Sequence, residues 1–270
     1  MGFSDLEQGS LIDYIDRLRE KSDHLWFFLH ITKTAGSSFS SELAARCRPY
    51  RNVHIDYADT TTPHQAQISN AVDRFIAEMA TQHFGSASGH VPFHLVRRIL
   101  EAKLDTQVVT FLRAPEARVI SDFRYQRTPM HPPYQTFIQE FPTIESYIES
   151  PQSQNKIAKF VYGTDRTCTV EELTRHAGEK FAFIGLLEMY PMSFNSIFAA
   201  MGHPGLAPSE HKRKTPDTKS TEVEITPAIR GLIRETNRLD QALYKYVRNI
   251  LQRHREEWLA NRKGPTKVTS

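Results

Sequence analysis

The chain has 270 residues, of which 39% are hydrophobic and 24% are charged, and its formal net charge is +3 at pH 7. This length and composition are typical of a globular protein that buries a substantial core, and they exclude a collagen-like or low-complexity chain. The net charge is too small to indicate nucleic-acid binding, and no apolar run approaches the roughly 18 to 20 residues that a membrane span requires.

The hydrophobic patterns predict helices and strands that alternate along the chain. Ser10 and Asp13 form a capping-box-like start for a helix over about residues 11–21. The expected strands lie near 26–31, 53–57, 85–91, 108–112 and 181–185. The expected helices between them pass through 42–46 and cover 65–82, 93–103 and 115–127. This alternation predicts an α/β fold, in which helices flank a mainly parallel central sheet, and one domain over residues 1–270 with its core at about 25–250.

Irregular segments and one long helix follow this alternation. The proline-rich stretch 128–134 could border a substrate cleft or be a plain surface crossover, and 204–226 is a second irregular stretch whose role stays open. Pro227 opens a helix that is expected to continue to Val247 and to pack on the core. The charged tail 253–270 is expected to be solvated and frayed.

The first segment with recognisable chemistry is the polar turn after the strand expected at 26–31. Ser37 and Ser38 can line the first turn of a helix, and Gly36 allows the backbone to approach an anion closely. Lys33 adds a positive charge to the same turn. The G-x-x-x-x-G-K-[ST] order of an ordinary ATPase loop is absent, and a strand–turn–helix with an incidental lysine is the alternative interpretation.

The second segment follows the strand expected at 108–112. Arg113 stands at the end of that strand, Pro115 suits the first turn of a helix, and Ser121 falls on the same helix. An arginine at a strand end and a serine on the next helix can bind one phosphate together. Arg118 and Arg124 are interpreted as solvated charges on the helix surface.

These segments resemble a family, the sulfotransferases that use 3′-phosphoadenosine 5′-phosphosulfate (PAPS), and most closely their carbohydrate branch related to heparan sulfate 2-O-sulfotransferase. Residues 30–38 resemble its 5′-phosphosulfate loop, and 110–115 through Ser121 resemble its 3′-phosphate site. The stretches 88–93, 181–188 and 237–244 are also similar. The sequence departs from the usual pattern at Thr32, Ala35 and Ala114, and these changes leave the charged groups of both segments in place.

The resemblance implies a P-loop-like sulfotransferase fold and a set of nucleotide-binding residues. The set expected to bind PAPS is Lys33, Thr34, Ala35, Gly36, Ser37, Ser38, Arg113 and Ser121. Lys212, Arg213 and Lys214 either close over the 3′-phosphate or form an ordinary solvated charge run. No metal site is expected, because the 12 histidines show no H-E-x-x-H or cysteine-paired spacing.

The expected catalytic residues are Lys33 and His90. Lys33 would contact the oxygen that bridges the sulfuryl group to the departing nucleotide. His90 matches the Gly-His-Val segment of the resembled family, and the ordinary imidazole pKa near 6.5 suits a general base. His94 is the alternative base, whereas Glu188 is expected to orient other groups or to be structural.

The expected function is therefore the transfer of a sulfuryl group from PAPS to a hydroxyl acceptor, with a carbohydrate favoured over a tyrosine or a small molecule. The alternatives are an atypical nucleotide-dependent kinase and a nucleotide-binding protein without catalytic activity. Eukaryotic members of the resembled family are Golgi membrane proteins, whereas this sequence shows no apolar run long enough for a membrane anchor. The expected location is therefore the bacterial cytoplasm, unless the chain is a trimmed Golgi-type catalytic domain. The sequence does not predict the oligomeric state.

Overall fold

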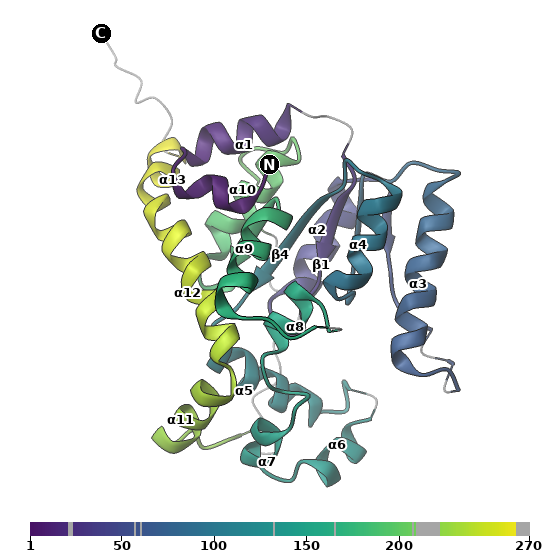
Figure 1. Cartoon of the computed structure of the whole chain (residues 1–270), viewed down its shortest axis with the longest axis vertical. Coiled ribbons are helices and arrows are strands. Elements are labelled where there is room, and N and C mark those ends of the chain that lie inside the picture. Colours follow the sequence, from purple (N-terminus) through teal and green to yellow (C-terminus); the bar gives the residue numbers. More distant parts are fainter. Residues whose placement is uncertain are drawn as a thin grey trace.

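The structure is a computed structural model, and it carries a central sheet flanked by helices (Figure 1). The residues that it describes are 1–20, 24–56, 58–59, 61–131, 133–164, 166–206, 208 and 222–262.

Five parallel strands form the sheet, in the order β2-β3-β1-β4-β5. They are β1 Trp26–Leu29, β2 Tyr50–Asn52, β3 Ser86–Gly89, β4 Gln107–Leu112 and β5 Phe183–Leu186. Every residue of β1, β3 and β5 is buried, as expected for a parallel sheet that helices cover on both faces. The α/β fold with a parallel sheet agrees with the sequence-based prediction.

Helices make up most of the remaining described chain. They are α1 Leu11–Arg19, α2 Gly36–Arg46, α3 His64–Met79, α4 Phe93–Ala102, α5 Pro115–Gln126, α6 Tyr134–Glu140, α7 Ile144–Glu149, α8 Lys156–Tyr162, α9 Val170–Lys180, α10 Tyr190–Ala200, α11 Pro227–Thr236, α12 Arg238–Arg253 and α13 Arg255–Arg262. Two 3₁₀ turns are η1 Phe3–Glu7 and η2 Leu187–Met189. Among the described helices, none combines the length and the apolar character that crossing a bilayer requires.

Aromatic side chains show which helices share a face of the sheet. Phe39 of α2 packs against Phe194 and Phe198 of α10, so these two helices share one face. Phe93 of α4 packs against His176 of α9, and α4 also contacts α3 and α8. These helices therefore form a second layer, as right-handed crossovers between parallel strands require.

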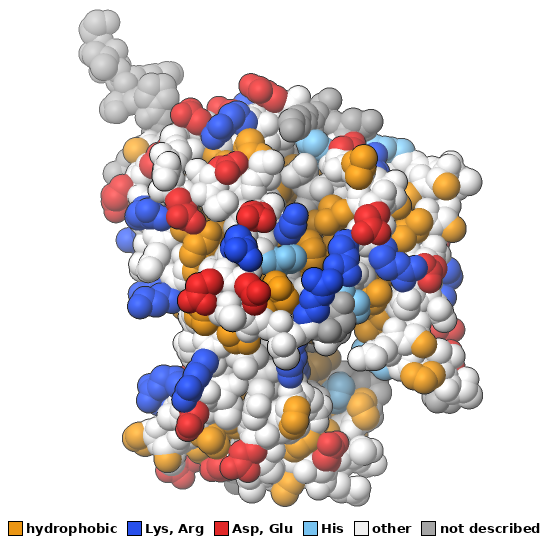
Figure 2. Space-filling model, viewed as in Figure 1, with side chains coloured by type: hydrophobic (Ala, Val, Ile, Leu, Met, Phe, Trp, Pro, Cys, Tyr) orange, Lys and Arg blue, Asp and Glu red, His pale blue; other side chains and the backbone are white. Residues whose placement is uncertain are grey.

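A second, smaller hydrophobic cluster lies beyond the carboxyl ends of the strands. It joins α5 to α6, α7 and α11, which form a lobe below the sheet in Figure 1. Its buried members are Val119, Phe123, Phe137, Phe141, Ile144, Tyr147, Ile148, Ile229 and Ile233. On the face seen in Figure 2 the surface is indented between this lobe and the body that holds the sheet, and histidine side chains lie along the indentation.

Three sequence-based expectations differ from the fold. The edge strand β2 covers Tyr50–Asn52 instead of 53–57. The hydrophobic pattern did not indicate this strand, because it is only partly buried and lacks the composition of a core strand. The long helix expected from Pro227 to Val247 is divided at Asn237, whose side chain bonds the backbone of Asn155 and Ile233. Part of the tail expected to fray instead forms α13, where the Glu257 carboxylate accepts bonds from α1. Residues 263–270 of that tail lie outside the described residues.

Candidate functional site

The turn between β1 and α2 is held in a backbone conformation that is unusual for its residues. Lys33 and Ala35 have φ angles of 67° and 72°, in the left-handed region that costs a non-glycine residue roughly 1–3 kcal/mol. At the next position, Gly36, a Cβ atom would overlap the ring of His30. Because strained backbone gathers at ligand-binding turns, this turn is a candidate site.

The first turn of α2 presents backbone N–H groups with no side-chain cap. Ala35 occupies the position before the helix and makes no capping hydrogen bond. The N–H groups of Gly36, Ser37 and Ser38 begin the helix and carry the positive end of its dipole. The fully buried Thr34 closes the turn, because its hydroxyl donates to the Ile31 carbonyl at 2.9 Å. This end of α2 can therefore bind an anion.

The structure brings together the two segments that the sequence singled out. Arg113 follows β4, which is the neighbour of β1 in the sheet, and its Nη1 donates to the Lys33 carbonyl at 3.3 Å across 80 residues of sequence. The Lys33 ammonium lies over the ring of Tyr125, 4.1 Å from the ring centroid. Two cations and the amino end of α2 thus meet at the carboxyl edge of the sheet, where open α/β folds bind ligands.

Arg113 is half-buried beside the carboxylate of Glu188. Burial lowers the pKa of Arg113, and the nearby Glu188 charge opposes that shift. Glu188 also accepts a hydrogen bond from the Ala114 N–H at 2.8 Å, which ties the end of β4 to the end of β5. Ser121 lies two turns into α5 and is half-buried. Within the described residues no hydrogen bond is seen between Ser121 and Arg113.

His90 lies at the carboxyl end of β3 with a fixed ring orientation. Its Nδ1 is 2.7 Å from the His30 carbonyl, which can only accept, so Nδ1–H donates and Nε2 keeps its lone pair. The rings of His90 and His30 stack with centroids 4.0 Å apart. Desolvation lowers the pKa of His90, against the raising effects of the His30 carbonyl and of Asp122. A neutral imidazole with a free Nε2 is the form that a general base needs.

His94, the alternative base, is already engaged. Its Nδ1 accepts from the Thr164 N–H at 3.3 Å and lies 3.4 Å from the Thr164 hydroxyl, on the side of α4 that faces the α8–α9 connection. The geometry therefore favours His90. Glu188 fits the structural role expected for it, because its bond with Tyr244 adds to burial in raising the pKa of that phenol to about 12.

A buried ionic network at α5 corrects one sequence-based interpretation. Arg118 is fully buried instead of solvated: its Nη1 lies 3.2 Å from Asp122, and its Nη2 donates to the Ser153 carbonyl. Lys156 approaches the same carboxylate at 2.7 Å, and the Tyr147 hydroxyl donates to it at 2.9 Å. The only sequence signal was the four-residue spacing of Arg118 and Asp122, which is common on exposed helices. Arg124 is half-buried.

This network also belongs to the surroundings of His90. Burial dominates the lowering of the pKa of His90, and Asp122, His64 and Lys156 also influence it electrostatically. Burial likewise lowers the pKa of His131, which Asp122 and Lys156 also affect. His131 belongs to the proline-rich stretch that could border a cleft. The titratable groups that influence His90 therefore include residues of α3, α5 and α8, and sequence spacing alone does not reveal this grouping.

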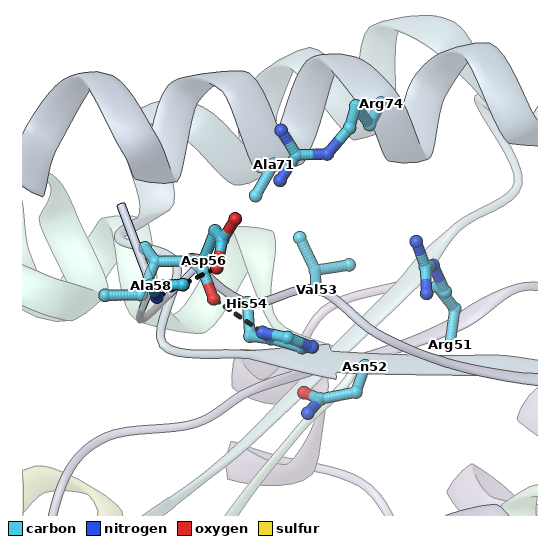
Figure 3. A pocket seen from close by; sticks show the side chains of 9 residues that line it. Arg51, Asn52, Val53, His54, Asp56, Ala58, Ala71 and Arg74 are labelled. Carbon is cyan, nitrogen blue, oxygen red and sulfur yellow. Dashed lines mark hydrogen bonds between the residues drawn. The ribbon is translucent and has the colours of Figure 1, made fainter. Parts of the chain in front are cut away.

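Two further features lie outside this cluster. Lys212, Arg213 and Lys214 lie outside the described residues. A cavity of about 300 Å³ lies between the end of β2 and α3, where Arg74 projects over Asp56 (Figure 3). Its lining residues include neither the β1–α2 turn nor Arg113. Across the described residues, no group of three or more His, Cys, Asp or Glu side chains is placed to hold a metal ion.

Comparisons with known proteins find structural similarity at low sequence identity. No protein-family model matches the chain, and no curated protein matches its sequence. A solved structure of a sulfotransferase from Alicyclobacillus acidocaldarius aligns with a TM-score of 0.47 at 14% identity, over 86% of this chain and 98% of the other. Mouse sulfotransferase SULT7A1 complexed with PAP aligns with a TM-score of 0.32 at 15% identity, over 90% of this chain and 95% of the other. At these scores the similarity assigns neither family nor function.

Proposed function

We propose that this protein transfers the sulfuryl group of PAPS to a hydroxyl acceptor. The observation that carries the proposal is the meeting of Lys33, Arg113 and the amino end of α2, with the free Nε2 of His90 at the neighbouring strand end. This arrangement offers separate cationic contacts for two phosphate groups and a base for a hydroxyl group. The sequence resemblance of residues 30–38 and 110–121 supports PAPS as the nucleotide.

The nucleotide would be held at its two phosphate ends. The N–H groups of Gly36, Ser37 and Ser38, with their serine hydroxyls, would bind the 5′-phosphosulfate. Arg113 would bind the 3′-phosphate, with Ser121 as a second donor. Thr34 and Ala35 would contribute through the backbone of the turn. Because the residues present are donors and cations, they fit an anionic nucleotide without requiring a protein-bound metal.

The chemical step would use His90 and Lys33. His90 Nε2 takes the proton of the acceptor hydroxyl as the oxygen forms its bond to sulfur. The bond from sulfur to the bridging oxygen of the nucleotide breaks, and the Lys33 ammonium stabilises the negative charge that appears on that oxygen. The products are the sulfated acceptor and adenosine 3′,5′-bisphosphate (PAP). Positioning and electrostatics would supply most of the rate enhancement, as in phosphoryl transfer.

A carbohydrate hydroxyl is the acceptor that we propose, because the sequence resembles the carbohydrate branch most closely. The test is to offer ³⁵S-labelled PAPS with a panel of saccharides, tyrosine peptides and phenols, and to offer γ-³²P-ATP with the same panel. The proposal expects label from PAPS on a saccharide and none from ATP. Transfer from ATP alone would identify a kinase, and nucleotide binding without transfer to any acceptor would indicate a non-catalytic protein.

A further inference from the structure

Tyr125 occupies a position that no sequence motif indicated. It lies in the last turn of α5, and its ring faces the Lys33 ammonium at 4.1 Å from the centroid, within the roughly 6 Å range of cation–π attraction. The ring is itself anchored. Its hydroxyl donates to the Met130 carbonyl at 3.2 Å, and the Tyr125 backbone carbonyl accepts from the Thr128 hydroxyl at 2.7 Å. Hydrogen bonds thus fix both the hydroxyl group and the backbone of Tyr125.

The contact with the Tyr125 ring orients the Lys33 side chain, which the Lys33 backbone alone does not orient. The backbone of Lys33 is fixed by its left-handed conformation and by the bond from Arg113 to its carbonyl. Beyond that backbone, a lysine side chain has four flexible carbon–carbon links and samples many directions in water. The ring of Tyr125 favours one of these directions. A catalytic group gains rate from being held in its working position, and small misplacements are costly.

Tyr125 also links the nucleotide side of the site to the stretch near His131. Its hydroxyl bonds the backbone of Met130, next in sequence to His131, and the rings of Tyr125 and His131 have centroids 6.0 Å apart. The pKa of His131, lowered mainly by burial, responds to Asp122 and Lys156, which also influence His90. Tyr125 therefore connects Lys33 to the turn that carries His131.

We propose that Tyr125 is a positioning residue of Lys33. Its ring holds the ammonium where charge develops during sulfuryl transfer, and its hydroxyl couples that position to the turn over residues 127–131. This inference rests on the proposed function. It assigns Tyr125 no proton transfer and no covalent step, because its contact is with Lys33 and not with reacting atoms.

The test compares Tyr125→Leu, which removes the ring, with Tyr125→Phe, which keeps it. Tyr162→Leu is the matched control, because Tyr162 is another half-buried tyrosine, packed on His176 in the α8–α9 region. Two quantities are measured for each variant: kcat for sulfuryl transfer from PAPS, and Kd for PAP. Thermal melting confirms that each variant is folded.

A third measurement, by NMR, does not depend on enzymatic activity. Reductive ¹³C-methylation labels the lysine amines, and Lys33→Arg identifies the Lys33 signal in the NMR spectrum. A methyl group over an aromatic face is shifted upfield by the ring current. The wild type and Tyr125→Phe should both show this shift, and Tyr125→Leu should lose it.

The proposal expects Tyr125→Leu to lower kcat about tenfold or more while Kd for PAP stays within about threefold of wild type. Tyr125→Phe should restore most of kcat, and Tyr162→Leu should leave both constants near wild type. A Tyr125→Leu enzyme with wild-type kcat, or a Lys33 signal without an upfield shift, overturns the proposal. A wild type that transfers no sulfuryl group would refute the proposed function instead, while the ring-current shift would still decide whether Tyr125 holds Lys33.

Discussion

Replacing His90 tests the proposed base. His90→Ala should lower kcat by roughly two to four orders of magnitude, the usual contribution of a positioned base. Affinity for PAP should stay near that of the wild type, because the anion contacts come from the β1–α2 turn and from Arg113. His94→Ala is the matched control, since its Nδ1 already accepts from Thr164, and it should change kcat by less than about threefold.

The pH dependence of the reaction provides a second test of His90 as the base. The pKa of His90 lies below the ordinary value of 6.5 because the ring is desolvated. The imidazole is then mainly neutral at pH 7.5, and kcat/KM should fall only as the pH drops through that lowered pKa. The assay is initial-rate transfer of ³⁵S from PAPS between pH 5 and 8, and His90→Ala should lack this acidic limb. The reasoning fails if His94→Ala gives the larger loss, or if the acidic limb persists without His90.

Four other substitutions have distinct expected outcomes. Arg113→Ala should weaken PAP binding by roughly 10- to 150-fold, which corresponds to the loss of one charge-assisted hydrogen bond. Calorimetry should show that AMP, which lacks the 3′-phosphate, binds within about threefold of its wild-type affinity. Equal losses for both nucleotides would place Arg113 away from the 3′-phosphate. Lys33→Ala should lower kcat much more than it raises Kd for PAPS in single-turnover assays, and unchanged turnover at saturating PAPS would contradict its role. Gly36→Ala should lose nucleotide binding, because its Cβ would displace the His30 ring, and tight PAP binding by a folded variant would show that the turn adapts. Arg118→Met should lower the free energy of unfolding, measured in urea, by about 3 kcal/mol, because the buried Asp122 carboxylate loses a partner. A loss no larger than that of the exposed control Arg234→Met would contradict this expectation.

Much of the fold follows from local sequence patterns. The apolar runs that became β1, β4 and β5 are almost entirely buried, so their composition marks them as strands, and their alternation with helices implies parallel pairing. The edge strand β2 gave a weaker signal, because none of its residues is fully buried. The break at Asn237 depends on a bond to Asn155, far away in sequence, so helical periodicity could not reveal it.

The candidate site was predictable where its residues follow strands. Lys33, His90 and Arg113 all come after carboxyl ends of parallel strands, which meet at one edge of the sheet. The types and positions of Lys33 and Arg113 indicated an anion site, and the family resemblance was needed to select His90. Tyr125 and Lys156 could not be selected in this way. They reach the site from helices α5 and α8, and only the packing of those helices determines where their side chains point.

The central claim is that one nucleotide joins the β1–α2 turn to the end of β4. The most direct measurement is a crystal structure of the protein with PAP. The 5′-phosphate should lie within hydrogen-bond distance of the first N–H groups of α2 and of Lys33, and the 3′-phosphate should contact the Arg113 guanidinium. PAP bound in the cavity between β2 and α3, or bound with its 3′-phosphate away from Arg113, would contradict the claim.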